Sequence, residues 1–141
     1  MQLIHIGAKS WAVGLWWQPM TSAPRKQLRE VNRQRKSAEQ PYNALVVLKR
    51  HKQIAVGTAA REKEAANQPS LAGALARVYG QYTNILAFFR FDDGTGWLFA
   101  IKDGQILPGG DLYAGQAKVE EEFVRLNQSS VWHQSIETAD T

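Results

Sequence analysis

The sequence predicts an α+β domain with a mostly antiparallel, hairpin-built sheet and about three helices, in the order ββα-ββα-βββ-α. The first observation behind this prediction is the length of 141 residues, which suits one domain. The second is that β-rich runs occur in pairs joined by short turn segments, as in hairpins. The third is that segments of helix-forming residues follow these pairs. Helices that alternate with hairpins, and not with single strands, indicate an α+β arrangement.

The first half of the chain predicts two hairpins and a helix between them. The helix covers residues 25–39, which contain neither glycine nor proline. Its apolar stripe is thin and consists of Leu28, Val31 and Ala38, so the helix is expected to pack loosely or to stay partly exposed. Residues that favour strands define the two hairpins, at residues 2–6 with 10–17 and at residues 42–48 with 53–58.

A second helix and a central strand follow. Ser70 is a candidate N-cap for a helix that begins at Leu71 and carries apolar residues at helical spacing. The strand over residues 84–92 has apolar side chains on both faces. Such a strand is usually central in its sheet and covered on both sides.

The end of the domain predicts a meander and a last helix. Strands over residues 97–102 and 105–107 follow tight turns, and Pro108-Gly109-Gly110 is expected to end the meander. Asp111 is then expected to cap a helix over residues 114–127.

The predicted organisation is one globular domain over residues 1–127 and a polar C-terminal tail over residues 128–141, in which a short last strand is left open. The longest apolar run, residues 11–17, is much shorter than the about 20 residues that a membrane-spanning helix needs. The chain has no cysteine, which excludes disulfides, thiolate metal sites and a cysteine nucleophile. The chain as given is therefore expected to be soluble.

Charge is divided unevenly along the chain. Residues 1–63 carry 12 Lys and Arg against three Glu, whereas residues 64–141 carry five against 10 Asp and Glu. Six basic residues gather on the first predicted helix, namely Arg25, Lys26, Arg29, Arg33, Arg35 and Lys36. Three interpretations stay open for them: a solvated helix face, a docking surface for an acidic protein, or a site for phosphates of nucleic acid or lipid.

Trp16 and Trp17 are neighbours in a predicted strand, so their side chains point to opposite faces. Both cannot fill one core, and the outward one would suit a partner contact, since tryptophan is favoured at interface hot spots. Trp17 is assigned to the partner-binding surface together with the six basic residues.

No complete catalytic or cofactor-binding motif is present. The run Gly7-Ala8-Lys9-Ser10 lacks the upstream glycine of a phosphate-binding loop. The three histidines are scattered and do not have metal-ligand spacing. Asp92, Asp93 and Asp111 would serve an enzyme only if the fold brought them into one polar pocket. The sequence therefore predicts a non-enzymatic protein with no metal and no cofactor.

Three stretches stand out as a set: IGAKSWAVGLWWQP at residues 6–19, GWLFAIKDGQILPGGD at residues 96–111, and the acidic segment from Glu120 to Leu126. Together they resemble the N-terminal region of the PilO-type pilin accessory proteins of type IVb pili. The resemblance extends from Ile4 to Leu126, which is most of the chain.

The resemblance implies a scaffold in pilus assembly. Members of that family are inner-membrane proteins with a cytoplasmic N-terminal region, followed by a membrane span that this chain does not reach. The resemblance implies that this domain lies on the cytoplasmic face of the bacterial inner membrane. There it would dock the assembly ATPase and other inner-membrane pilus proteins. It also implies an actin-like or ribonuclease-H-like fold, reduced in this chain, and it supplies no catalytic residues.

The alternative function is a nucleic-acid-binding module that uses the basic helix over residues 25–36. Nucleic acid is not the expected partner, however, because the resemblance points to proteins of the assembly machine. Association of the chain with copies of itself is left open.

Overall fold

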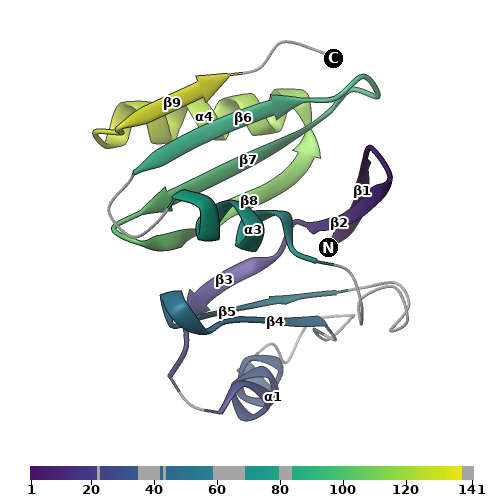
Figure 1. Ribbon diagram of the computed structural model, residues 1–141, viewed down its shortest axis with the longest axis vertical. Coiled ribbons are helices and arrows are strands. Elements are labelled where there is room, and N and C mark those ends of the chain that lie inside the picture. Colours follow the sequence, from purple (N-terminus) through teal and green to yellow (C-terminus); the bar gives the residue numbers. More distant parts are fainter. Residues whose placement is uncertain (22, 35–41, 43, 59–68, 80–83, 138–141) are drawn as a thin grey trace.

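Helices and mostly antiparallel sheets make up the described part of the chain, so the predicted α+β class is confirmed (Figure 1). The computed structural model describes residues 1–21, 23–34, 42, 44–58, 69–79 and 84–137. Within these residues the helices are α1 (Pro24–Gln34), α3 (Leu71–Tyr79) and α4 (Gln116–Ser129), with a short 3-10 helix η1 (Lys49–His51).

The strands among the described residues form three sheets. The strands β1 (Gln2–Ile6) and β2 (Lys9–Val13) make a hairpin. The small sheet has the order β3-β5-β4 and contains β3 (Trp16–Pro19), β4 (Ala44–Leu48) and β5 (Gln53–Gly57). The large sheet has the order β8-β7-β6-β9 and contains β6 (Ile85–Arg90), β7 (Thr95–Lys102), β8 (Gln105–Gly115) and β9 (Gln134–Glu137). Its β6 and β9 run parallel, and the other pairs are antiparallel. An actin-like or ribonuclease-H-like relationship stays a prediction.

The large sheet is covered on both faces (Figure 1). Leu86 and Phe88 of β6 pack on one face with Phe123 of α4. Ile85 and Ala87 of β6 belong to the core on the other face, which the small sheet and α3 cover. The strand β6 is therefore the central, doubly covered strand that its apolar residues predict.

The strand predicted over residues 10–17 is divided in two at Gly14. This residue has φ = +78°, a left-handed conformation that glycine adopts without steric cost. The chain leaves the β1–β2 hairpin at Val13 and enters the small sheet at Trp16. The prediction of one continuous strand is wrong, because the alternation of apolar residues continues across a break in the backbone.

The strand β8 continues through Pro108-Gly109-Gly110, where the sequence predicts the end of the meander. Its register against β7 shifts around Ala100, and a Cβ atom on Gly110 would lie 2.6 Å from the carbonyl oxygen of Ala100. Glycine thus allows the close approach of two backbones at a bulge. Helix α4 consequently begins at Gln116, and Asp111 lies within β8. The prediction that Asp111 caps a helix is wrong.

Asp111 carries a buried carboxyl group that joins the small sheet to the large sheet. It is 3% exposed and accepts four hydrogen bonds. The backbone N–H groups of Gly14 and Leu15 donate at 2.9 and 3.3 Å, and the indole Nε1 of Trp17 donates at 3.0 Å. From β7, the indole Nε1 of Trp97 donates at 2.7 Å. Burial raises the pKa of the Asp111 carboxyl, and the four hydrogen bonds offset part of that rise.

Gln53 makes a second polar link between the sheets. The side chain of this β5 residue donates from Nε2 to the carbonyl oxygen of Ile106 at 2.8 Å. Its Oε1 accepts the backbone N–H of Ile106 at 2.9 Å. Because Ile106 belongs to β8, this buried pair of hydrogen bonds fixes the small sheet against the large one.

Other boundaries differ in detail from those predicted. The N-cap at Ser70 is confirmed, since its Oγ accepts the N–H of Gly73 at 3.1 Å. The large sheet extends beyond the predicted boundary at residue 127, because β9 pairs with β6 and Glu137 forms an ion pair with Arg90. None of the described helices combines the length and the apolar composition of a membrane span.

Replacing Asp111 with Ala is expected to destabilise the domain by about 3–5 kcal/mol, because each buried donor that loses its acceptor costs about 1–3 kcal/mol. Urea unfolding followed by tryptophan fluorescence measures this loss. The exposed Asp92 supplies the matched control, since Asp92→Ala should change stability by less than about 0.5 kcal/mol. An Asp111→Ala variant as stable as the control would contradict this assignment.

The stability contribution of Asp111 should also depend on pH. The pKa of Asp111 in the folded domain lies above the ordinary value of 3.8, which applies to the unfolded chain. At a pH between these two pKa values, the folded state therefore binds more protons than the unfolded state. The free energy of unfolding should therefore fall as pH rises from about 3.8 through that window, and then level off. The difference in unfolding free energy between wild type and Asp111→Asn, measured from about pH 4 to about pH 7, isolates this component. A difference that rises with pH would refute the raised pKa.

Candidate partner interface

Helix α1 presents basic side chains to solvent. Arg25, Lys26, Arg29 and Arg33, here called the basic stripe, are all exposed. Arg33 forms an ion pair with Glu30 at 3.1 Å. The other three side chains make no ion pair with any residue that the structure describes. Judged on the described residues, the outer face of the helix therefore carries positive charge that no carboxylate pairs.

Two side-chain amides hold α1 in place. They matter because the thin apolar stripe of the helix offers little apolar packing. The buried Gln27 donates from Nε2 to the carbonyl oxygen of Pro19 at 2.8 Å and accepts the N–H of Thr21 at 3.1 Å. Asn32 makes a similar pair of bonds with the backbone of Tyr42, at 2.9 and 2.8 Å. The helix is thus anchored through polar groups near both of its ends. Predicted residues 35–39 of this helix lie outside the described residues.

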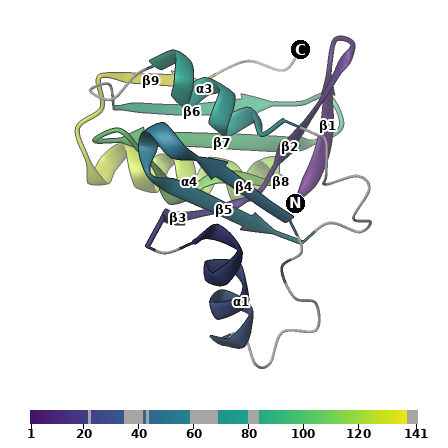
Figure 2. The ribbon, with the colours of Figure 1, turned by 60° about the horizontal axis from the view of Figure 1, so that its bottom comes forward.

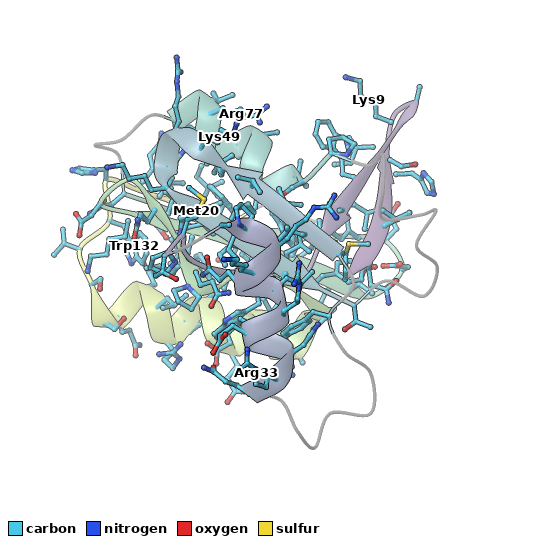
Figure 3. The ribbon with its side chains drawn as sticks, turned by 90° about the horizontal axis from the view of Figure 1, so that it is seen from below. Lys9, Met20, Arg33, Lys49, Arg77 and Trp132 are labelled. Atoms are coloured by element: carbon cyan, nitrogen blue, oxygen red, sulfur yellow. The ribbon has the colours of Figure 1, made fainter. Side chains whose placement is uncertain are left out.

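Helix α1 projects from the small sheet, on the side away from the large sheet (Figure 2). In Figure 1 it lies at one end of the longest axis, and β9 lies at the other end with α4 beside it. Figure 3 views the domain from the end that carries α1, with Arg33 labelled. The basic stripe and the acidic run Glu120–Glu122 of α4 therefore lie towards opposite ends of the domain.

The other three residues assigned to the partner surface are Arg35, Lys36 and Trp17, and none of them is found on a described surface. Arg35 and Lys36 lie outside the described residues. Trp17 is 0% exposed and donates its indole N–H to Asp111, so its assignment to the surface is wrong. Its neighbour Trp16 is the outward member of the pair, at 46% exposed. Alternation predicts that one of the two is exposed, but the buried acceptor Asp111 decides which one.

The three carboxylates considered for catalysis are not brought into one pocket. Asp93 lies in the β6–β7 turn, where it accepts hydrogen bonds from the N–H and hydroxyl of Thr95 that lower its pKa. Asp92 is exposed in the same turn. Asp111 pairs in register with Phe99 of β7. Phe99 lies four residues along β7 from Thr95, which is a distance of about 13 Å. Among the described residues, no three His, Asp or Glu side chains form a group that could hold a metal ion.

A second group of basic side chains lies outside α1. Lys49 and Arg50 of η1 and Arg77 of α3 line a hollow of about 380 Å³, and Val47 and Leu48 are its other lining residues within the described part of the chain. This set is here called the basic hollow, and Figure 3 labels Lys49 and Arg77 beside each other. No local sequence pattern predicts this cluster, because Arg77 is distant in the chain from Lys49 and Arg50.

The sequence matches a known protein family over most of its length. A family model described as pilin accessory protein (PilO) matches residues 11–137, which is most of the chain. The chain belongs to the pilin accessory protein family. This membership confirms the resemblance found in the sequence and assigns the protein to type IV pilus biogenesis. No curated protein matches the chain.

A solved structure shares the fold of this family member. The structure is titled "Crystal structure of the cytoplasmic domain of BfpC", and it superposes with a TM-score of 0.66 at 15% sequence identity. The similarity covers 96% of this chain and 82% of that chain. At this identity the likeness concerns the fold.

Removing the amide of Gln27 should loosen α1. We expect Gln27→Ala to cost about 1–3 kcal/mol, because the N–H of Thr21 and the carbonyl oxygen of Pro19 lose their partner. Hydrogen exchange of the α1 amides should accelerate while exchange in β6 and β7 stays slow. Gln34→Ala, at an exposed position of the same helix, is the control. Unchanged exchange in α1 of the Gln27→Ala variant would show that the amide does not anchor the helix.

Proposed function

We propose that this domain is a non-enzymatic scaffold of a type IVb pilus assembly machine, which docks the cytoplasmic assembly ATPase through the basic stripe of α1. The observation that carries the proposal is the exposure of Arg25, Lys26 and Arg29, which have no ion pair within the described residues. An acidic surface on the partner would supply the missing carboxylates. Arginine suits this role, because its guanidinium binds a carboxylate through two parallel hydrogen bonds.

The position of the stripe on its helix adds to the attraction for negative charge. Arg25 and Lys26 lie in the first turn of α1, and that turn contains no acidic residue. Backbone N–H groups at a helix N-terminus carry partial positive charge of the same sign. The amide anchors at Gln27 and Asn32 hold the helix before binding, which lowers the entropy lost on association.

The proposal includes an orientation of the domain in which the partner binds on the side away from the membrane. We place the domain at the cytoplasmic face of the inner membrane, in line with its family and with the titled "cytoplasmic domain" of its structural neighbour. A membrane span after the C-terminal end would lie nearer β9 than α1, since these elements occupy opposite ends of the domain (Figure 1). The basic stripe would then face the cytoplasm, where the ATPase and other pilus proteins could bind it.

Reversing the charge of the stripe should abolish docking. We expect the double variant Arg25→Glu and Arg29→Glu to bind the cognate ATPase at least about tenfold more weakly, measured by isothermal titration calorimetry. The matched control is Lys118→Glu, an exposed charge reversal on α4, which should bind as wild type does. Circular dichroism of each variant checks that the domain is folded.

Two results would contradict the proposal. One is equal ATPase affinity of the double variant and wild type. The other is a gel shift of DNA or RNA by wild type that weakens steeply with salt and is lost in the double variant, without any ATPase binding. The second result would favour the nucleic-acid-binding module instead.

A further inference from the structure

The basic hollow lies where the small sheet meets α3. Its described lining residues come from the last turn of α3, from η1 and from the end of β4. Val47 and Leu48 supply apolar surface, and Lys49, Arg50 and Arg77 supply positive charge. A hollow of about 380 Å³ has room for one or two side chains of a bound segment.

The three cations of the hollow have no ion-pair partner among the described residues. Lys49, Arg50 and Arg77 are exposed and make no ion pair with a described residue. The described residues from 16 to 58 contain seven Lys and Arg but only one acid, Glu30, which pairs with Arg33. Like charges gathered at a concave surface repel one another and attract an anionic ligand.

The strand beside the hollow has one edge that pairs with no strand in the described part of the chain, here called its open edge. In the order β3-β5-β4, β4 is an outer strand that pairs with β5 alone. No other described backbone group forms a hydrogen bond with Ala44–Leu48. The outward N–H and C=O groups of such an edge strand are a template for an added strand.

We propose that the open edge of β4 and the basic hollow together bind an extended acidic segment of a partner protein. The segment adds to the small sheet as a strand and places a carboxylate side chain against Lys49, Arg50 and Arg77. A neighbouring apolar side chain of the segment packs on Val47. A peptide fits better than a free phosphate, because only a peptide satisfies the backbone edge, the apolar surface and the cations at once. This site is separate from the basic stripe of α1.

The test uses the blocked peptide acetyl-Glu-Val-Glu-Val-Glu-Val-Glu-amide and the isotope-labelled full chain, followed by NMR. We expect the peptide to shift the backbone amides of Val46, Val47, Leu48 and Lys49 and that of Arg77. The double variant Arg50→Glu and Arg77→Glu should bind at least about tenfold more weakly. The stripe variant Arg25→Glu with Arg29→Glu should bind as wild type does. This control separates the present proposal from the proposed docking of the ATPase.

Modified peptides test the mode of binding. Successive N–H groups of a strand point to opposite edges. Of two peptides methylated on all Val or on all Glu nitrogens, one should therefore lose binding. If both methylated peptides bind as tightly as the parent, strand addition is wrong. The same peptide with Lys in place of Glu should not bind, and its binding would overturn the role of the cations. If inorganic phosphate shifts these amides and the acidic peptide does not, the hollow is a phosphate site and the proposal fails.

Discussion

The buried carboxyl group of Asp111 determines how the rest of the domain is assembled. It accepts hydrogen bonds from Gly14, Leu15 and Trp17 on one side and from Trp97 on the other, so it joins the N-terminal segment to the large sheet. Trp17 belongs to β3 of the small sheet, and the carbonyl oxygen of Pro19 at the end of β3 accepts the anchoring hydrogen bond from Gln27 of α1. The position of the projecting helix thus depends, step by step, on one acceptor. A buried acceptor with four donors imposes this geometry, because any other arrangement would leave buried N–H groups without partners.

Local sequence patterns predict much of this fold, and long-range contacts account for the rest. The doubly apolar strand at residues 84–92, the hairpins and the cap at Ser70 follow from side-chain alternation and turn chemistry within a few residues. Asp111 looks like a helix cap in the sequence because it follows two glycines, and its partners Gly14 and Trp17 are far away in the chain. The same distance hides which of Trp16 and Trp17 is buried.

The sequence predicts one part of the candidate interface, the basic stripe, and not the other, the basic hollow. The basic stripe on α1 is a local pattern, and the structure exposes its described members. The basic hollow is not local, because Arg77 meets Lys49 and Arg50 only through the packing of α3 near the end of β4. Positive charge therefore gathers around α1 and the small sheet, while the acidic run Glu120–Glu122 lies on α4. The uneven charge along the sequence becomes a separation of charge between the two ends of the folded domain, which suits the docking role proposed for it.

Electrostatic docking has a direct kinetic signature. Association of complementary charged surfaces speeds up as ionic strength falls, whereas dissociation changes little. The measurement is the stopped-flow association rate of the domain with its cognate assembly ATPase, between about 50 mM and about 500 mM NaCl. The account predicts that the association rate constant falls steeply, by about tenfold or more, over this range. An association rate that does not depend on salt would contradict docking through the basic stripe.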